Sequence, residues 1–282
     1  PARPLTIRHL LTHTSGLLYG GESDDGVAEM YKRAEVWKAD TLEEFVKRLA
    51  AQPLAAQPGT QWHYSVSLDV LGRLVEVVSG RPFDRFLKER IFDPLGMTDT
   101  GFFVPRGKLD RLAASYGPDG DGGMKLLDAP GESSYLDPEK IPYGGHGLVS
   151  TAADYLRFAQ MLANSGELDG VRILGRKTVD LMMSNHLAPE LGPAPLGEAA
   201  DWYQSDPRGL GFGLSGAVVT DVGRGGLSGT AGSFFWGGNA TTYFWVDREE
   251  RLVGLLLTQL SPSDTYPLRG AMRALTYQAL ID

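Results

Sequence analysis

The chain has 282 residues, of which 27 are basic and 35 acidic, so its formal net charge is −8. This balance and the lack of a basic run argue against nucleic acid as a partner, because phosphate binding needs clustered lysine and arginine. The sequence contains no cysteine, which excludes disulfides, zinc–thiolate sites and a cysteine nucleophile. The lack of cysteine does not decide the compartment, although we favour the cytoplasm over export.

No apolar stretch reaches the roughly 18–20 residues that a membrane-spanning helix needs. The longest apolar run, Leu252 to Leu257, fits a buried strand instead. The chain begins at Pro1 without an initiator methionine or a secretory signal. We therefore expect these residues to be the interior of a longer gene product.

Helical patterns dominate the first part of the chain. Thr6 is a candidate N-cap for a short helix over residues 7–14, and Thr41 is a candidate N-cap for a second helix. Residues 19–40 are mixed and polar, which predicts a long loop. Residues 67–79 place apolar side chains at helical spacing, which predicts a buried helix.

The pattern changes near residue 209, where short runs of aromatic and aliphatic residues replace the helical spacing. We predict three strands over residues 233–236, 241–246 and 252–259, the last of them buried on both faces because it is nearly all apolar. A C-terminal helix should begin after Pro267. Its apolar positions, which we expect to face the core, are Leu268, Ala271, Leu275 and Leu280.

Helices followed by a strand meander and a helix indicate an α+β fold class. Residues 1–208 form a mostly helical region with long loops. Residues 209–282 form a region of antiparallel strands with the C-terminal helix. We expect both regions to belong to one catalytic domain.

Two positions have residue types that acyl-transfer chemistry uses. Tyr64 precedes a predicted helix, and a tyrosine there can move a proton between a serine and a leaving group. The segment Trp236-Gly237-Gly238-Asn239 ends a predicted strand, where the glycines let a substrate approach the main chain closely. A free N–H in such a turn can stabilise an oxyanion. An ordinary half-buried tyrosine and a plain hairpin turn are the alternatives, and neither position alone decides between the interpretations.

The histidines do not predict a metal site. His9 and His13 have the i, i+4 spacing of zinc helices, but no acidic residue lies between them and no third ligand is evident. His146, in a glycine-rich stretch, fits a turn better than a ligand position. The lack of a Gly-x-Ser-x-Gly elbow argues against an α/β-hydrolase triad. We assign structural roles to the histidines and expect no metal and no cofactor.

Four segments together carry a resemblance that none of them carries alone. In chain order they are IRHLLTHTSGL from Ile7, YSVSLDVLGRLVEVVSG from Tyr64, PYGGHGLVSTAADYLRFAQML from Pro142 and GSFFWGGNATTYFWVD from Gly232. The combination resembles the serine beta-lactamase-like superfamily, and within it the family VIII carboxylesterases, relatives of class C beta-lactamases and penicillin-binding proteins. It implies a beta-lactamase/transpeptidase-like fold, with an antiparallel sheet flanked by helices and a mostly helical region, lacking its N-terminal segment.

The motif that should supply the nucleophile is absent. Members carry Ser-x-x-Lys upstream of the HLLTHTSGL segment, and no serine of this chain has a lysine three positions later. The resemblance implies that the missing serine is the nucleophile and the lysine its base, that Tyr64 shares their proton transfers, and that the N–H of Asn239 helps to hold the oxyanion. It makes Ser15 part of a structural segment, not a nucleophile. The missing segment would come from the same gene product or from another chain.

Two departures from beta-lactamases bear on substrate binding. Val66 stands where lactamases keep an amide side chain that grips the substrate. Trp236, before Gly237 and Gly238, stands in place of the lysine that meets a lactam carboxylate. Because binding a carboxylate without a cation carries a desolvation penalty, both changes favour neutral esters.

The resemblance therefore implies a serine carboxylesterase that acts on small neutral esters through an acyl-enzyme. Acyl transfer and weak beta-lactamase activity are alternatives within the same superfamily. A catalytically inactive fragment or binding domain is the alternative outside it, because Ser-x-x-Lys is missing. The 282-residue chain alone is expected to be inactive.

Overall fold

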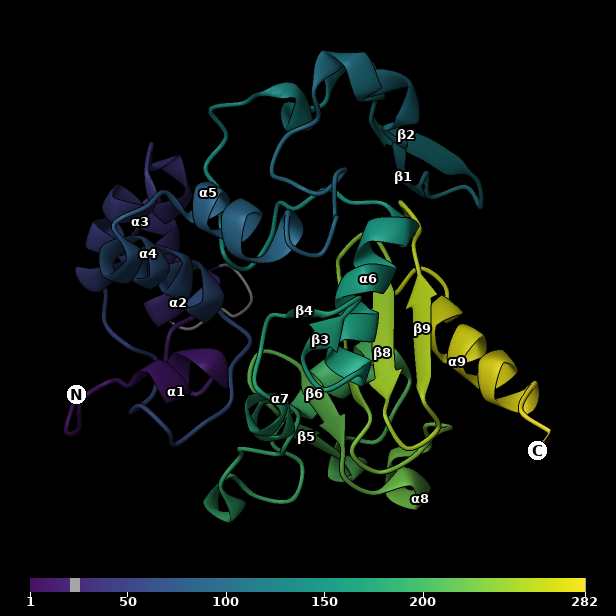
Figure 1. The fold of residues 1–282 in the computed structure, drawn as a ribbon. Coiled ribbons are helices and arrows are strands. Elements are labelled where there is room, and N and C mark those ends of the chain that lie inside the picture. The colour runs from purple at the N-terminus through teal and green to yellow at the C-terminus, as the bar shows by residue number, and fades with distance from the viewer. Residues whose placement is uncertain (21–25, 282) are drawn as a thin grey trace.

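A five-stranded antiparallel sheet lies at the centre of the larger lobe in Figure 1. The computed structural model describes residues 1–20 and 26–281, apart from the side chain of Glu198. The strands follow one another across the sheet in chain order. They are β5 (Leu210–Phe212), β6 (Ala217–Val219), β7 (Phe234–Gly237), β8 (Tyr243–Asp247) and β9 (Leu252–Leu256).

The meander predicted after residue 209 is confirmed for β7, β8 and β9. The prediction missed β5 and β6, because each has only three residues and alternation cannot be recognised over so short a run. The prediction that the last strand is buried on both faces is wrong. β9 lies at an edge of the sheet, and only Gly254 within it is fully buried.

Alternating residues of β8 bury the two faces of the sheet. Phe244 and Val246 pack against the side of helix α6 (Ala152–Ala163). Tyr243 and Trp245 pack with Met272 of helix α9 (Leu268–Gln278) on the opposite face. The sheet therefore forms the middle layer, and the predicted α+β arrangement is confirmed (Figure 1).

The N-terminal helices form a separate cluster with its own core (Figure 1). They are α1 (Ile7–Leu11), α2 (Gly26–Arg33), α3 (Leu42–Ala50) and α4 (Ser67–Ser79). The predicted caps are confirmed: the Thr6 hydroxyl accepts the N–H of His9, and the Thr41 hydroxyl accepts the N–H of Glu44. The bounds predicted for the helix that α4 forms are also confirmed.

The long loop predicted over residues 19–40 is wrong in its second half. Helix α2 and a 3₁₀ turn, Val36–Lys38, lie there, whereas residues 21–25 fall outside the described part of the chain. Ala28 and Tyr31 explain the helix, since they are three residues apart and both are buried in the core of the N-terminal helices. The many charged residues of this segment hid that short apolar stripe.

Two predicted apolar faces are wrong in the same way, because each helix exposes apolar residues and buries polar ones. Helix α4 leaves Val78 exposed and instead buries Asp69, so its predicted full burial does not hold. Helix α9 buries Arg269 and Arg273 and leaves Leu275 64% exposed, together with Ala271, and Leu280 is exposed beyond the end of the helix. The buried polar side chains bind main-chain groups of other segments, which apolar periodicity does not register.

The remaining elements connect these layers. They are α5 (Phe83–Leu87), which a π-turn continues, the hairpin β1 (Ser115–Pro118) with β2 (Met124–Asp128), the short pair β3 (Glu167–Leu168) with β4 (Val171–Arg172), α7 (Arg176–Met182) and α8 (Val222–Gly225). Core residues from both sides of position 208 pack together, since Leu162 of α6 and Val246 of β8 share one cluster. Within the described residues, no helix has the length and apolarity to cross a bilayer.

Candidate active site

Tyr64 lies just before α4 and is surrounded by rings. Its ring centroid is 4.8 Å from that of His13, 5.4 Å from that of Tyr19, 5.3 Å from that of Trp202 and 5.6 Å from that of Trp236. The structure therefore brings together Tyr64 and Trp236, which the sequence singled out in two separate segments. The phenol ring of Tyr64 and the indole of Trp236, near the end of β7, belong to the same aromatic cluster.

We call Tyr19, Trp202 and Trp236 the aromatic wall. Tyr19 follows α1, Trp202 belongs to the 3₁₀ segment Gly197–Tyr203, and Trp236 belongs to β7. Trp202 and Trp236 meet edge to face with their ring centroids 6.3 Å apart. Since all three are only partly buried, the wall offers apolar surface beside Tyr64.

The turn after β7 is a tight loop that reverses the chain into β8. The N–H of Gly238 donates to the carbonyl oxygen of Thr242 at 3.1 Å, and the N–H of Thr241 donates back to Gly238 at 3.1 Å. Asn239, at the tip, is exposed, and within the described chain its main-chain N–H has no hydrogen-bond partner. Its side chain donates to the hydroxyl of Ser261 at 2.8 Å. The tip is therefore held by its side chain, and no described residue occupies its main-chain N–H.

The two glycines of the turn make room for the protein's own atoms. A Cβ on Gly237 would lie 2.5 Å from the carbonyl oxygen of Thr242 and 2.9 Å from the guanidinium carbon of Arg269. A Cβ on Gly238 would lie 2.6 Å from the hydroxyl of Thr242. Packing thus accounts for both glycines, and their expected contact with substrate stays a prediction.

Arg269 of α9 is a site residue that the sequence did not point to. Its guanidinium donates to the carbonyl oxygens of Gly238 at 2.5 Å and Trp202 at 3.1 Å, and it lies 5.1 Å from the ring centroid of Tyr203. Burial lowers the pKa of Arg269, although an arginine keeps its charge at neutral pH. One buried cation therefore ties the turn to the aromatic wall. The available clue was the i, i+4 pair Arg269 and Arg273 within an otherwise amphipathic helix.

Val66 lies apart from the aromatic wall. Its side chain is fully buried and packs in the core of the N-terminal helices, with Leu10 and Phe45 in the same cluster. The structure does not bring this side chain to the surface near Tyr64. Its expected contact with substrate stays a prediction, and its apolar character serves the core.

His146 extends the aromatic surface from another direction. Its ring stacks on Tyr143 at 4.8 Å and meets Trp37 edge-on at 5.4 Å; Trp37 in turn stacks on Tyr19 of the aromatic wall at 5.6 Å. Buried Asp69 of α4 accepts the N–H of Gly145 at 2.8 Å, and its carboxylate lies 3.6 Å from Nδ1 of His146. The glycine-rich loop around His146 is thereby fixed to the helix that follows Tyr64.

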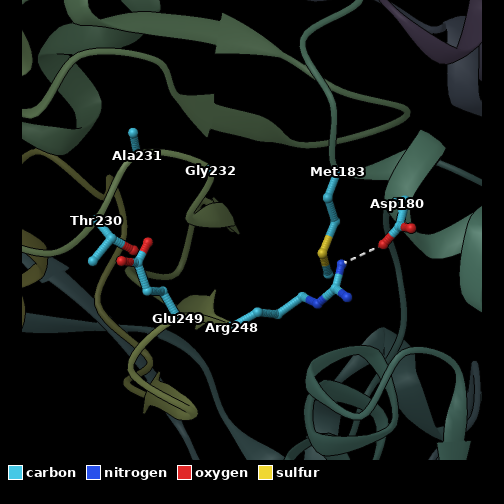
Figure 2. A pocket seen from close by; sticks show the side chains of 7 residues that line it. All are labelled: Asp180, Met183, Thr230, Ala231, Gly232, Arg248 and Glu249. Atoms are coloured by element: carbon cyan, nitrogen blue, oxygen red, sulfur yellow. Dashed lines mark hydrogen bonds and ion pairs between the residues drawn. The ribbon is translucent and has the colours of Figure 1, made fainter.

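A pocket lies elsewhere, lined by Asp180 of α7, the loop of residues 230–232 before β7 and the turn between β8 and β9 (Figure 2). It has a volume of about 260 Å³ and holds none of the predicted site residues. Its arginine, Arg248, is already paired with Asp180 at 2.8 Å. In the described part of the chain, no group of three or more His, Cys, Asp or Glu side chains is placed to bind a metal ion.

Comparison with known proteins shows the family of the chain. The Beta-lactamase family model matches residues 1–278. Protein Rv1367c of Mycobacterium tuberculosis (strain ATCC 25618 / H37Rv) is 37% identical over 269 residues, covering 92% of this chain and 63% of that protein. Lovastatin esterase of Penicillium rubens is 34% identical over 271 residues, covering 90% of this chain and 64% of that enzyme.

The fold is also similar to that of a solved structure. EstCE1, described as a hydrolase with promiscuous acyltransferase activity, has a TM-score of 0.78 and 28% identity, covering 97% of this chain and 72% of that one. The chain spans less than two thirds of the length of the two sequence relatives. The resemblance seen in the four segments and the beta-lactamase/transpeptidase-like fold are both confirmed. The chain belongs to the Beta-lactamase family, a hydrolase family with esterase and acyltransferase relatives.

Proposed function

We propose that this chain carries the proton-transfer and oxyanion-binding side of a serine carboxylesterase for small neutral esters. The observation that carries the proposal is the 5.6 Å ring contact between Tyr64 and Trp236, next to a turn whose Asn239 N–H is unpartnered among the described residues. The serine and lysine of Ser-x-x-Lys are absent from this sequence, so we assign them to residues outside it.

The proposed reaction passes through an acyl-enzyme. The serine hydroxyl attacks the ester carbonyl carbon, and its proton passes through the lysine and Tyr64 to the leaving alkoxide as the carbon–oxygen bond breaks. The N–H of Asn239 and that of the serine hold the negative charge on the carbonyl oxygen. Water then attacks the acyl carbon, its proton returns to the serine oxygen, and a carboxylic acid leaves.

The surroundings of Tyr64 favour a neutral substrate. The aromatic wall offers apolar surface, and the cation beneath it, Arg269, is buried and occupied by two carbonyl oxygens. A substrate carboxylate placed against this surface would lose water without gaining a charged partner. An ester with a modest apolar acyl group avoids that cost.

Acyl transfer is the second candidate. It is favoured by the likeness to EstCE1, whose description includes both hydrolysis and acyl transfer. The same acyl-enzyme serves both reactions, and they differ in whether water or another alcohol attacks it. Product analysis with and without an added alcohol separates them.

The test measures ester hydrolysis by a preparation that contains both this chain and the Ser-x-x-Lys segment. A p-nitrophenyl butyrate assay gives the rate, and a fluorophosphonate probe reports an activated serine. We expect Tyr64→Phe to lower kcat by roughly 10²–10⁴-fold, the range for loss of a positioned proton donor. The melting temperature should change little, because only one hydroxyl is removed.

Tyr116→Phe is the matched control, since Tyr116 is 45% exposed on β1. It should keep wild-type kcat. Unchanged turnover in Tyr64→Phe would remove this residue from the mechanism. A preparation with Ser-x-x-Lys that neither turns over esters nor takes the probe would support the inactive binding domain instead.

A further inference from the structure

His13 is held in a backbone conformation that most residues avoid. Its φ is +54°, in the left-handed region, and its side chain is 2% exposed. Residues other than glycine enter this region uncommonly, histidine more often than most, and surrounding contacts are needed to hold them there. The contacts of His13 should therefore show what its conformation serves.

Those contacts converge on one residue. The carbonyl oxygen of His13 accepts the N–H of His63 at 2.9 Å, and its ring Nδ1 accepts the N–H of Ser65 at 3.2 Å. The residue between them is Tyr64, whose ring packs against the His13 ring at 4.8 Å. His13 thus binds both main-chain neighbours of Tyr64 and packs against its side chain.

The ring of His13 is neutral and does not act as a base itself. Burial lowers the pKa of His13 to about 3, and the groups packed around it are the rings of Trp62, Tyr64 and Phe212 and the hydroxyl of Ser65. Because Nδ1 accepts the N–H of Ser65, its proton is assigned to Nε2. At neutral pH the residue can influence the reaction only through the groups it contacts.

We propose that His13 is a positioning residue that sets the place and orientation of the Tyr64 hydroxyl. The inference rests on the proposed function of Tyr64. Anchoring residues 63 and 65 fixes the main chain of Tyr64, and the ring contact restricts its side-chain torsions. Proton transfer requires heavy atoms within about 2.6–3.2 Å, so a small displacement of the phenol lowers the rate.

Two substitutions separate the anchor from the backbone conformation. Asparagine and glycine both tolerate a positive φ, but only His13→Asn keeps an acceptor near the position of Nδ1. In the preparation that contains Ser-x-x-Lys, we expect His13→Gly to lower kcat by about 10- to 100-fold with little change in KM. The kcat of His13→Asn should be at least several-fold higher than that of His13→Gly, although both variants lose the same ring. Rates are expressed per folded molecule, from the fraction folded in a thermal melt.

A double-mutant cycle with Tyr64→Phe distinguishes positioning from general destabilisation. If His13 acts through the Tyr64 hydroxyl, His13→Gly should reduce kcat less than about two-fold once that hydroxyl is gone. An equal fold-loss with and without Tyr64→Phe would overturn the inference. Should His13→Gly not fold, the same cycle with His13→Asn decides. Wild-type turnover in Tyr64→Phe alone is a different result, because it would refute the proposed function of Tyr64.

Discussion

The two sides of the candidate site are anchored by buried residues with opposite hydrogen-bonding roles, one neutral acceptor and one cationic donor. On the Tyr64 side, neutral His13 offers acceptors to main-chain N–H groups. On the side of the turn, cationic Arg269 offers donors to main-chain carbonyl oxygens. The neutral anchor needs no countercharge, whereas the buried cation is stabilised by two carbonyl dipoles, an aromatic face and the charge of the Asp264 carboxylate. The two sides should therefore respond differently to mutation and to pH.

After Tyr64→Phe, the largest expected effect comes from the turn itself. Asn239→Pro removes the main-chain N–H, and loss of one oxyanion donor costs about 10²–10³-fold in kcat. Asn239→Ala keeps that N–H and loses only the side-chain bond to Ser261, so its kcat should stay within a few-fold of wild type. Steady-state kinetics on the two variants give the comparison. Equal loss in both would mean that the side chain of Asn239, and not its N–H, matters.

Removing the buried cation should weaken the turn side alone. Arg269→Met removes the charged hydrogen bonds to the carbonyl oxygens of Gly238 and Trp202, which keep only the N–H of Thr241 and the side-chain amide of Gln204 as donors. We expect a loss of about 2–3 kcal/mol in the free energy of unfolding, the range for hydrogen bonds to a charged group. Arg269→Lys keeps the charge but cannot span both carbonyls in the same way, so its loss should be smaller. Urea unfolding gives the free energy of unfolding of both variants. An Arg269→Met variant as stable as the wild type would show that the cation is not an anchor.

The neutral anchor should make stability depend on pH. The pKa of His13 is about 3 in the folded state, against 6.5 ordinarily, so the unfolded chain binds a proton below pH 6.5 that the folded chain does not. Its contribution is complete above pH 6.5 and declines as the pH falls toward 3, by at most about 1.4 kcal/mol per pH unit. From pH 7.5 to pH 5 the loss should total about 2 kcal/mol.

His9 acts in the same direction, because burial and the nearby Arg3 and Arg8 lower its pKa as well. The measurement is therefore the difference in urea-unfolding free energy between wild type and His13→Asn at each pH. The difference should shrink as the pH falls. A difference that is constant from pH 7 to 5 would show that His13 is not held neutral by burial.

Local features were predictable from the sequence, and the anchors were not. Capping by Thr6 and the bounds of α4 depend on neighbouring residues, so the sequence predicted them correctly. The anchors depend on bonds between distant segments: 52 positions separate His13 from Ser65, and 31 separate Arg269 from Gly238. Periodicity also treated arginine as an exposed residue, although the carbonyl groups it binds make its burial favourable. The motif resemblance therefore pointed to Tyr64 and the turn, but not to what holds them.

The smallest expected effect tests the choice of substrate. Trp236→Lys places a second cation beside a turn that already holds Arg269, and it removes one member of the aromatic wall. A lysine there can meet a carboxylate, so the ratio of kcat/KM for an anionic beta-lactam to that for p-nitrophenyl butyrate should rise about ten-fold, or roughly 1.4 kcal/mol. Trp236→Leu is the control, because it removes the indole without adding charge. If both substitutions change the ratio equally, size rather than charge governs selection at this wall. An unchanged ratio in Trp236→Lys would show that the wall does not contact the acyl group, and the preference for neutral esters would need another origin.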